Sequence, residues 1–142
     1  MRKLISTLSG QEYPFEKVEE FTENGEPLEV RIEGIENARI RNGKQLARRF
    51  ASFLPYQSIG PELSMGEGNT PLLNATPDLR NFTGINNLLL KNETQNPTWS
   101  FKDRGSLTCM MMSKEMDEQV TAAISTGNMG NSMAACRQRL VC

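Results

Sequence analysis

The pattern that most constrains the fold is a strand–loop–helix alternation in the second half of the chain. Residues 88–90 form a short apolar run, followed by a polar turn and an expected helix over residues 101–116. Residues 121–124 form a second apolar run, which leads through a Gly-containing loop to an expected helix over residues 129–139. Two such units in succession are typical of an α/β protein with a parallel sheet and flanking helices. We therefore predict that fold class, with residues 88–90 buried on both faces of the sheet.

The first half of the chain gives weaker signals. Residues 28–32 alternate apolar with charged side chains, which predicts a half-buried strand. Apolar side chains at helical spacing predict a helix over residues 43–54, which Pro55 ends. Residues 76–87 contain proline, glycine and an Asn-Asn pair, so we expect a short helix or a turn there.

Composition excludes several classes of function. The 142 residues include no histidine, which removes the Ser-His-Asp and Cys-His nucleophile systems and every histidine metal site. The three cysteines include no Cys-x-x-Cys pair, and we expect no metal site. Their odd number, without a signal peptide, indicates a reducing interior and argues against a disulfide framework. The net charge of −1 gives no general attraction to nucleic acid or to an anionic membrane, and no apolar run is long enough to span a bilayer. We therefore expect a cytoplasmic protein without nucleic-acid or membrane partners.

A lysine stands at the start of the helix expected over residues 101–116. Lys102 follows a Pro-containing turn in the segment Asn-Pro-Thr-Trp-Ser-Phe-Lys-Asp-Arg-Gly, residues 96–105, with Ser100 as the expected N-cap. The positive end of a helix dipole and removal from water both disfavour the ammonium form of a lysine. The uncharged amine is the form that attacks an aldehyde, so the position suits Schiff-base chemistry. Taken alone, an exposed lysine at an ordinary helix start is the simpler interpretation.

A second motif, Ser125-Thr126-Gly127-Asn128, lies where the second apolar run meets the second helix. Free backbone N–H groups and short polar side chains at such a junction can hold an anion or a carboxylate. Gly127 would let the backbone approach a ligand closely. A capped helix start without a ligand is the simpler interpretation of this motif alone. A third motif, Gly-Glu-Gly-Asn-Thr-Pro-Leu at residues 66–72, predicts a turn followed by an extended segment.

Together, the three motifs resemble those of threonine synthases, which belong to the fold-type-II, tryptophan-synthase-β-like family of pyridoxal-phosphate enzymes. The motifs occur in the family's order and at similar spacing, and the clear resemblance extends from about residue 66 to residue 135. We assign residues 1–60 to an N-terminal arm or subdomain. The resemblance implies that residues 61–142 begin the cofactor-binding α/β domain.

The resemblance also implies a role for each motif residue. Lys102 would form the Schiff base with pyridoxal phosphate and later move protons, and Asn128 would hydrogen-bond the cofactor's 3′-hydroxyl. Ser125, Thr126 and Gly127, with neighbouring backbone N–H groups, would hold the α-carboxylate of a small amino-acid substrate. The implied enzyme is a carbon–oxygen lyase that converts O-phospho-L-homoserine and water to L-threonine and phosphate, a step of threonine biosynthesis.

The sequence departs from this family in two respects. Position 99 is Trp where Gly is common, so a positive φ there would strain the backbone, whereas at an ordinary φ Trp99 would pack beside the pocket. Family members run to several hundred residues, and their phosphate loop and the residue facing the pyridine nitrogen lie beyond position 142. We therefore expect a truncated portion that is catalytically incomplete alone. Its exposed sheet edge and apolar faces would favour pairing with another chain, including a homo-oligomer.

Two alternatives stay open from the sequence. The chain could come from another fold-type-II enzyme, such as a threonine/serine dehydratase or a cysteate synthase, because these share the lysine chemistry. It could also be a truncated relative without catalytic activity. The three motifs in their order favour the synthase.

Overall fold

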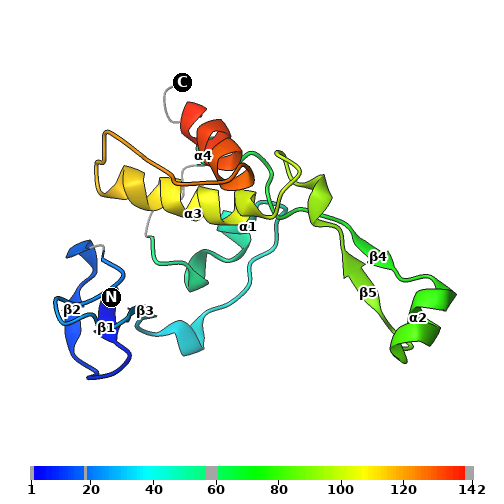
Figure 1. Cartoon of the computed structure of the whole chain (residues 1–142), viewed down its shortest axis with the longest axis horizontal. Helices are drawn as coiled ribbons and strands as arrows, with labels where there is room; N and C mark the ends of the chain where they lie inside the picture. Colours follow the sequence, from blue (N-terminus) through cyan, green and yellow to red (C-terminus); the bar gives the residue numbers. More distant parts are fainter. Residues whose placement is uncertain (1, 18, 57–60, 140–142) are drawn as a thin grey trace.

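The computed structural model describes residues 2–17, 19–56 and 61–139. Three groups of elements follow one another along the chain: a small N-terminal sheet, a central hairpin arm and a pair of helices (Figure 1). Short 3-10 helices connect them, namely η1 (Phe15–Lys17), η2 (Ile35–Asn37), η3 (Ala51–Phe53), η4 (Pro61–Leu63) and η5 (Glu93–Gln95).

The N-terminal sheet has three antiparallel strands in the order β2-β1-β3. These are β1 (Arg2–Ser6), β2 (Glu12–Pro14) and β3 (Leu28–Ile32), with β1 in the centre. Leu4 and Ile5 of the central strand are buried. The strand predicted over residues 28–32 is confirmed as β3.

Arg2 links this sheet to the rest of the protein. Its guanidinium donates a hydrogen bond to the Pro55 carbonyl and pairs with Glu115 at the end of helix α3 (Lys102–Glu115). The same guanidinium lies 4.3 Å from the centre of the buried Phe15 ring, a cation–π contact. The N-terminal sheet is thus held at the far end of α3 from Lys102.

The helix predicted over residues 43–54 is replaced by two shorter pieces. Helix α1 (Leu46–Arg49) is followed by Phe50 and then by η3. Phe50 has φ −107° and ψ 18°, which departs from α-helical geometry. The chain therefore leaves the α conformation after one turn and tightens into a 3-10 turn before Pro55.

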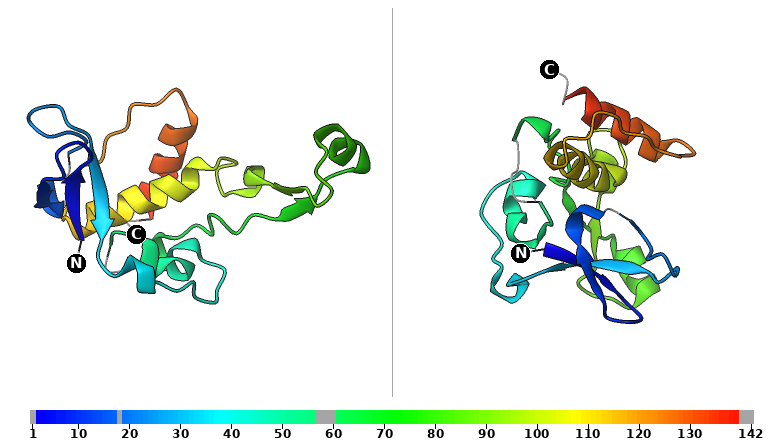
Figure 2. Two further views of the ribbon diagram at one scale, coloured as in Figure 1. Left: turned by 90° about the horizontal axis from the view of Figure 1, so that it is seen from below. Right: turned by 90° about the vertical axis from the view of Figure 1, so that its left-hand side faces the viewer.

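The central hairpin arm consists of β4 (Leu72–Asn74), β5 (Leu89–Lys91) and helix α2 (Pro77–Thr83) at its tip. The two strands are antiparallel, and the arm projects from the rest of the molecule (Figure 2). Helix α2 begins at Pro77 because the Thr76 hydroxyl accepts a hydrogen bond from the Leu79 N–H at 3.3 Å.

The expectation that residues 88–90 are buried on both faces is wrong. Leu89 and Leu90 are 49% and 41% exposed, and Leu72 and Leu73 on the partner strand are also exposed. The physical reason is that β5 pairs only with the equally short β4 in a two-stranded sheet, and no other described element makes extensive contact with this hairpin.

The hydrophobic core lies between α3 and helix α4 (Asn128–Gln138), which pack against each other. Both helices were predicted to within one residue at each end. Leu107, Met110 and Met111 on α3 are fully or almost fully buried. The core also includes Ala47, Tyr56, Leu63, Met133 and Cys136. Phe101, the residue that precedes α3, is 58% exposed and is not part of this core.

The predicted parallel sheet is not found among the described residues, since both of their sheets are antiparallel. Residues 121–124, the second expected strand, have no strand partner, and Ile124 is fully exposed. A parallel strand needs a neighbour in hydrogen-bonding register, and none of the described strands lies beside this segment. The mixture of helices and strands agrees with the α/β class.

None of the described helices is long and apolar enough to cross a membrane. Within the described ranges, no group of three or more carboxylate or thiol side chains is arranged to hold a metal ion.

Candidate functional site

Lys102 is the first residue of α3. The Ser100 hydroxyl accepts a hydrogen bond from the Lys102 N–H at 3.3 Å, and the Asn96 carbonyl accepts one from the Trp99 N–H at 2.8 Å. The helix boundary falls one residue later than expected, at Phe101 rather than Ser100. The turn expected before Lys102 is therefore a hydrogen-bonded unit that ends in the helix.

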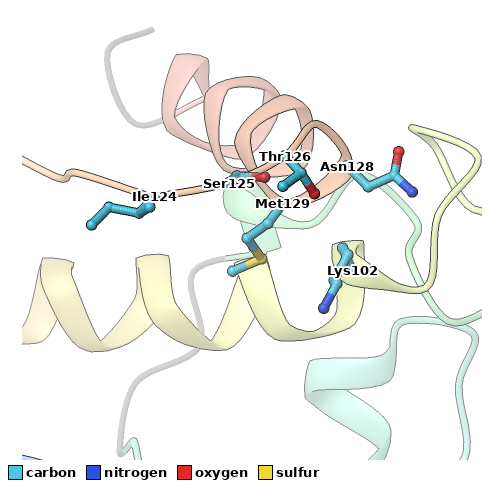
Figure 3. A pocket seen from close by; sticks show the side chains of 6 residues that line it. All are labelled: Lys102, Ile124, Ser125, Thr126, Asn128 and Met129. Atoms are coloured by element: carbon cyan, nitrogen blue, oxygen red, sulfur yellow. The ribbon is translucent and has the colours of Figure 1, made fainter.

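The structure brings Lys102 into one pocket with the residues around the start of α4. This pocket has a volume of about 540 Å³ and is lined by Lys102, Ile124, Ser125, Thr126, Asn128 and Met129 (Figure 3). Four of the five predicted site residues therefore share a pocket, and Gly127 is not among the lining residues. The Lys102 amine lies 4.9 Å from the centre of the Phe101 ring, and its side chain runs away from the Asn128 amide in this view.

Ser125 and Gly127 shape the start of α4. The Ser125 hydroxyl oxygen accepts hydrogen bonds from the N–H groups of Gly127, at 3.1 Å, and Gly130, at 3.0 Å. Gly127 has φ 147° and ψ −83°, a backbone conformation that side chains with a Cβ rarely adopt. Ser125 thus acts as a helix cap and retains its O–H proton for donation, while Thr126 and Asn128 are exposed to solvent.

Asp103 joins three segments around the pocket. Its carboxylate is completely buried and accepts hydrogen bonds from the Thr98 N–H at 2.8 Å and from the Thr98 hydroxyl. It also accepts a hydrogen bond from the buried Ser132 hydroxyl on α4, at 2.6 Å. One carboxylate therefore fixes the turn before α3, the start of α3 and the first half of α4 to each other.

Arg104, the next residue of α3, makes a second connection. Its guanidinium forms a bidentate pair with Glu93, with Nε and Nη2 at 2.8 and 2.7 Å from the two carboxylate oxygens. Glu93 also accepts hydrogen bonds from the Asn96 amide at 2.9 Å and the Thr70 hydroxyl at 3.0 Å. The hydrogen bond from Arg104 is the largest cause that lowers the pKa of Glu93 to about 2.

The third motif is attached to this network through Gly68. Its N–H donates to the Asn96 side-chain oxygen at 2.9 Å, and its φ is +78°. A Cβ at this position would lie 2.4 Å from Leu46 Cδ1 and 2.8 Å from Arg104 Nη1. Glycine is therefore required both by the backbone conformation and by the close approach of α1 and α3.

Trp99 has the positive φ that was expected to strain the backbone at this position. Its φ is +59°, in the left-handed region, and its side chain is 82% exposed, so it does not pack beside the pocket. The Trp ring gains little from burial there, and the backbone has the conformation that glycine adopts without cost.

Sequence reasoning missed Ser132 as the partner of Asp103. It also treated the motif at residues 66–72 as a turn without chemistry of its own. The available signal for Ser132 was a small polar residue one helical turn after Asn128, on a helix that otherwise buries methionine and cysteine. That signal indicates a buried hydrogen bond, but the sequence does not identify the acceptor.

Comparison with known proteins agrees with this geometry. The sequence model of the family described as "Pyridoxal-phosphate dependent enzyme" matches residues 63–140. The chain belongs to this family. The matched region contains all five predicted site residues as well as Asp103 and Arg104. The cofactor of this family is pyridoxal phosphate, and its substrates are small molecules.

Several relatives of the chain are named threonine synthase. The chain is 41% identical over 100 residues to that of Bacillus sp. (strain ULM1) and 34% identical over 105 residues to that of Methanocaldococcus jannaschii. The threonine synthase of Halalkalibacterium halodurans is 38% identical over 90 residues. These matches cover 68%, 74% and 63% of this chain but 27%, 26% and 25% of the relatives. The chain thus spans about a quarter of the length of these relatives. No solved structure gives a significant match.

Replacing Trp99 with glycine should stabilise the protein. A left-handed conformation costs a residue with a Cβ roughly 1–2 kcal/mol, and the greater freedom of glycine in the unfolded chain offsets part of the gain. We expect Trp99→Gly to raise the free energy of unfolding by about 1 kcal/mol in urea denaturation. Trp99→Ala is the matched control, because it removes the exposed ring but keeps the Cβ. Equal stability of the two variants would show that backbone strain is not the cause.

The stabilisation contributed by Glu93 should depend on pH. Its pKa is lowered to about 2 in the folded protein, below the value of about 4.3 for an unfolded chain. The pair with Arg104 therefore contributes fully above the unfolded pKa and is lost as the pH falls towards 2.

This dependence can be measured by urea denaturation of the wild type and Glu93→Gln between pH 2 and 8. We expect the difference in unfolding free energy to be constant above about pH 5.5 and to shrink steadily below it. Glu23→Gln, which removes an exposed carboxylate, should leave the free energy of unfolding unchanged near neutral pH. A difference between wild type and Glu93→Gln that stays constant down to pH 2 would contradict this role of Glu93.

Proposed function

We propose that this chain forms the lysine-bearing part of a threonine-synthase-like enzyme. The reaction would convert O-phospho-L-homoserine and water to L-threonine and phosphate, and would class the enzyme as a carbon–oxygen lyase acting on phosphates. The observation that carries the proposal is the pocket shared by Lys102 and the loop at residues 124–129. The names of the relatives support the substrate, since those described above are named threonine synthase.

The residues of the pocket fit pyridoxal phosphate chemically. The cofactor combines an aldehyde, a flat pyridine ring and a hydroxyl next to the aldehyde. The pocket offers a primary amine at Lys102, an amide at Asn128 and the apolar side chains of Ile124 and Met129. Its volume of about 540 Å³ lies within the usual range for small-molecule sites.

Each residue would have a distinct task in this pocket. Lys102 would attach the cofactor through Nζ and, once released from it, would accept and return a proton at the same atom. Asn128 would donate a hydrogen bond from its amide to the 3′-hydroxyl. When bound, the cofactor supplies an electron sink for charge that develops at the substrate's α-carbon.

The loop before α4 would orient the substrate. The Ser125 hydroxyl already accepts two backbone hydrogen bonds, so its remaining O–H can donate to an α-carboxylate. The Thr126 hydroxyl is exposed at the pocket and can donate in the same way. Gly127 would contribute through its backbone, at the positive end of the α4 dipole. The cytoplasmic location, the homo-oligomer and the domain division at residues 60–61 expected from the sequence are part of this proposal.

Covalent trapping tests the role of Lys102. The wild type, incubated with pyridoxal phosphate and then reduced with borohydride, should carry a stable adduct that peptide mass spectrometry maps to Lys102. The adduct should be absent in Lys102→Ala. Lys114→Ala is the matched control, because Lys114 lies on the same helix but pairs with Glu62 at 2.6 Å, far from the pocket. Adducts spread evenly over several lysines would contradict a dedicated site.

Product analysis tests the reaction. Phosphate release from O-phospho-L-homoserine, with formation of L-threonine, would support the synthase, whereas ammonia release from L-threonine would indicate a dehydratase. A folded protein that carries the adduct on Lys102 and releases neither product would indicate a portion without catalytic activity of its own.

A further inference from the structure

We propose that Asp103 is a positioning residue for the Lys102 pocket. In this proposal its carboxylate sets the distance and register between the start of α3, where Lys102 lies, and the start of α4, where Asn128 lies. The inference rests on the proposed function for its significance, because it concerns the same pocket. One buried carboxylate would thus hold together the two walls of the pocket, which are the start of α3 and the start of α4.

The geometry places Asp103 between the two walls. Lys102 and Asp103 are neighbours in the first turn of α3, and one lines the pocket while the other is completely buried. The Asp103 carboxylate reaches Ser132 on α4 at 2.6 Å. Ser132 lies four residues after Asn128, one turn along the same side of the helix. Anchoring Ser132 therefore also fixes where Asn128 stands relative to Lys102.

The second anchor of Asp103 fixes the turn that leads into Lys102. Both hydrogen bonds from Thr98, one from its N–H and one from its hydroxyl, end on the two carboxylate oxygens. Hydrogen bonds to an ionised acceptor are shorter and stronger than those between neutral groups. The turn therefore cannot shift relative to α4 without breaking contacts to a fully buried charge, which is costly.

Other contacts beside the pocket are weaker. The Ser106 hydroxyl lies 3.8 Å from the Met129 sulfur, and a thioether is a poor acceptor. Apolar packing between α3 and α4 holds the helices together but tolerates sliding, because dispersion contacts have little directionality. The register between the two pocket walls thus depends mainly on the Asp103 carboxylate.

Glu67 provides a matched comparison. It is also a completely buried carboxylate, and it accepts hydrogen bonds from the Ser64 hydroxyl at 3.0 Å and the Met65 N–H at 2.8 Å. Both donors belong to its own loop, so Glu67 makes no hydrogen bond that joins α3 to α4, although its charge also acts on Arg104 of α3 and Cys136 of α4. Loss of its charge should therefore lower global stability without a specific effect on the pocket.

Amide hydrogen exchange tests the proposal without the cofactor. Ser132→Ala removes the link to α4 and leaves the Asp103 carboxylate and its Thr98 contacts in place. The backbone N–H of Asn131 donates a hydrogen bond to the Gly127 carbonyl. We expect the exchange rate of this N–H to rise about tenfold relative to the rates of backbone N–H groups in the middle of α3. Glu67→Gln should change the exchange rates of all these backbone N–H groups by the same factor, because it should act through global stability. Equal and uniform effects of the two variants would overturn the proposal.

Cofactor binding provides the second readout. The apparent dissociation constant for pyridoxal phosphate should rise about tenfold in Ser132→Ala and stay within about twofold of wild type in Glu67→Gln. An unchanged constant in Ser132→Ala would overturn the proposal. If the wild type binds no cofactor, the exchange measurement alone decides. Ammonia release from L-threonine, in place of phosphate release from O-phospho-L-homoserine, would count against the proposed reaction and would leave both expected results for Asp103 unchanged.

Discussion

The buried Asp103 carboxylate is the contact on which the geometry around Lys102 depends. It receives donors from the turn before α3 and from α4, so it converts two separate walls into one pocket. A charge with no exposed surface is stable only when its hydrogen bonds are made, and this requirement specifies the relative position of the segments more sharply than apolar packing does.

Arg104, the residue after Asp103, also connects separate segments through a charged group, in this case the third motif at residues 66–72. The bidentate pair with Glu93 gathers Asn96 and Thr70 around one carboxylate, and Asn96 in turn holds Gly68. The motifs at residues 66–72 and 96–105 are therefore parts of one polar network. Lys102, which lines the pocket, is followed directly by these two charged residues, Asp103 and Arg104, which connect α3 to other segments.

Local sequence patterns were sufficient for part of this structure. The limits of α3 and α4 and the position of β3 follow from periodicity and from polar boundaries, which act over a few residues. The sequence also grouped Lys102 with Ser125, Thr126 and Asn128. It could not reveal the exposure of Leu89 and Leu90 or the unpaired segment at residues 121–124, because these depend on which strands lie alongside. The sequence also could not reveal the Asp103–Ser132 hydrogen bond, because each residue alone fits an ordinary helix and the contact depends on how α3 and α4 pack.

A double-mutant cycle between Asp103 and Ser132 tests the central claim most directly. The free energies of unfolding of wild type, Asp103→Asn, Ser132→Ala and the double variant give the interaction energy of the two side chains. The account predicts a coupling of about 1–2 kcal/mol, as expected for a buried hydrogen bond to a charged acceptor. Additive effects, with a coupling near zero, would show that the carboxylate does not hold α3 and α4 together.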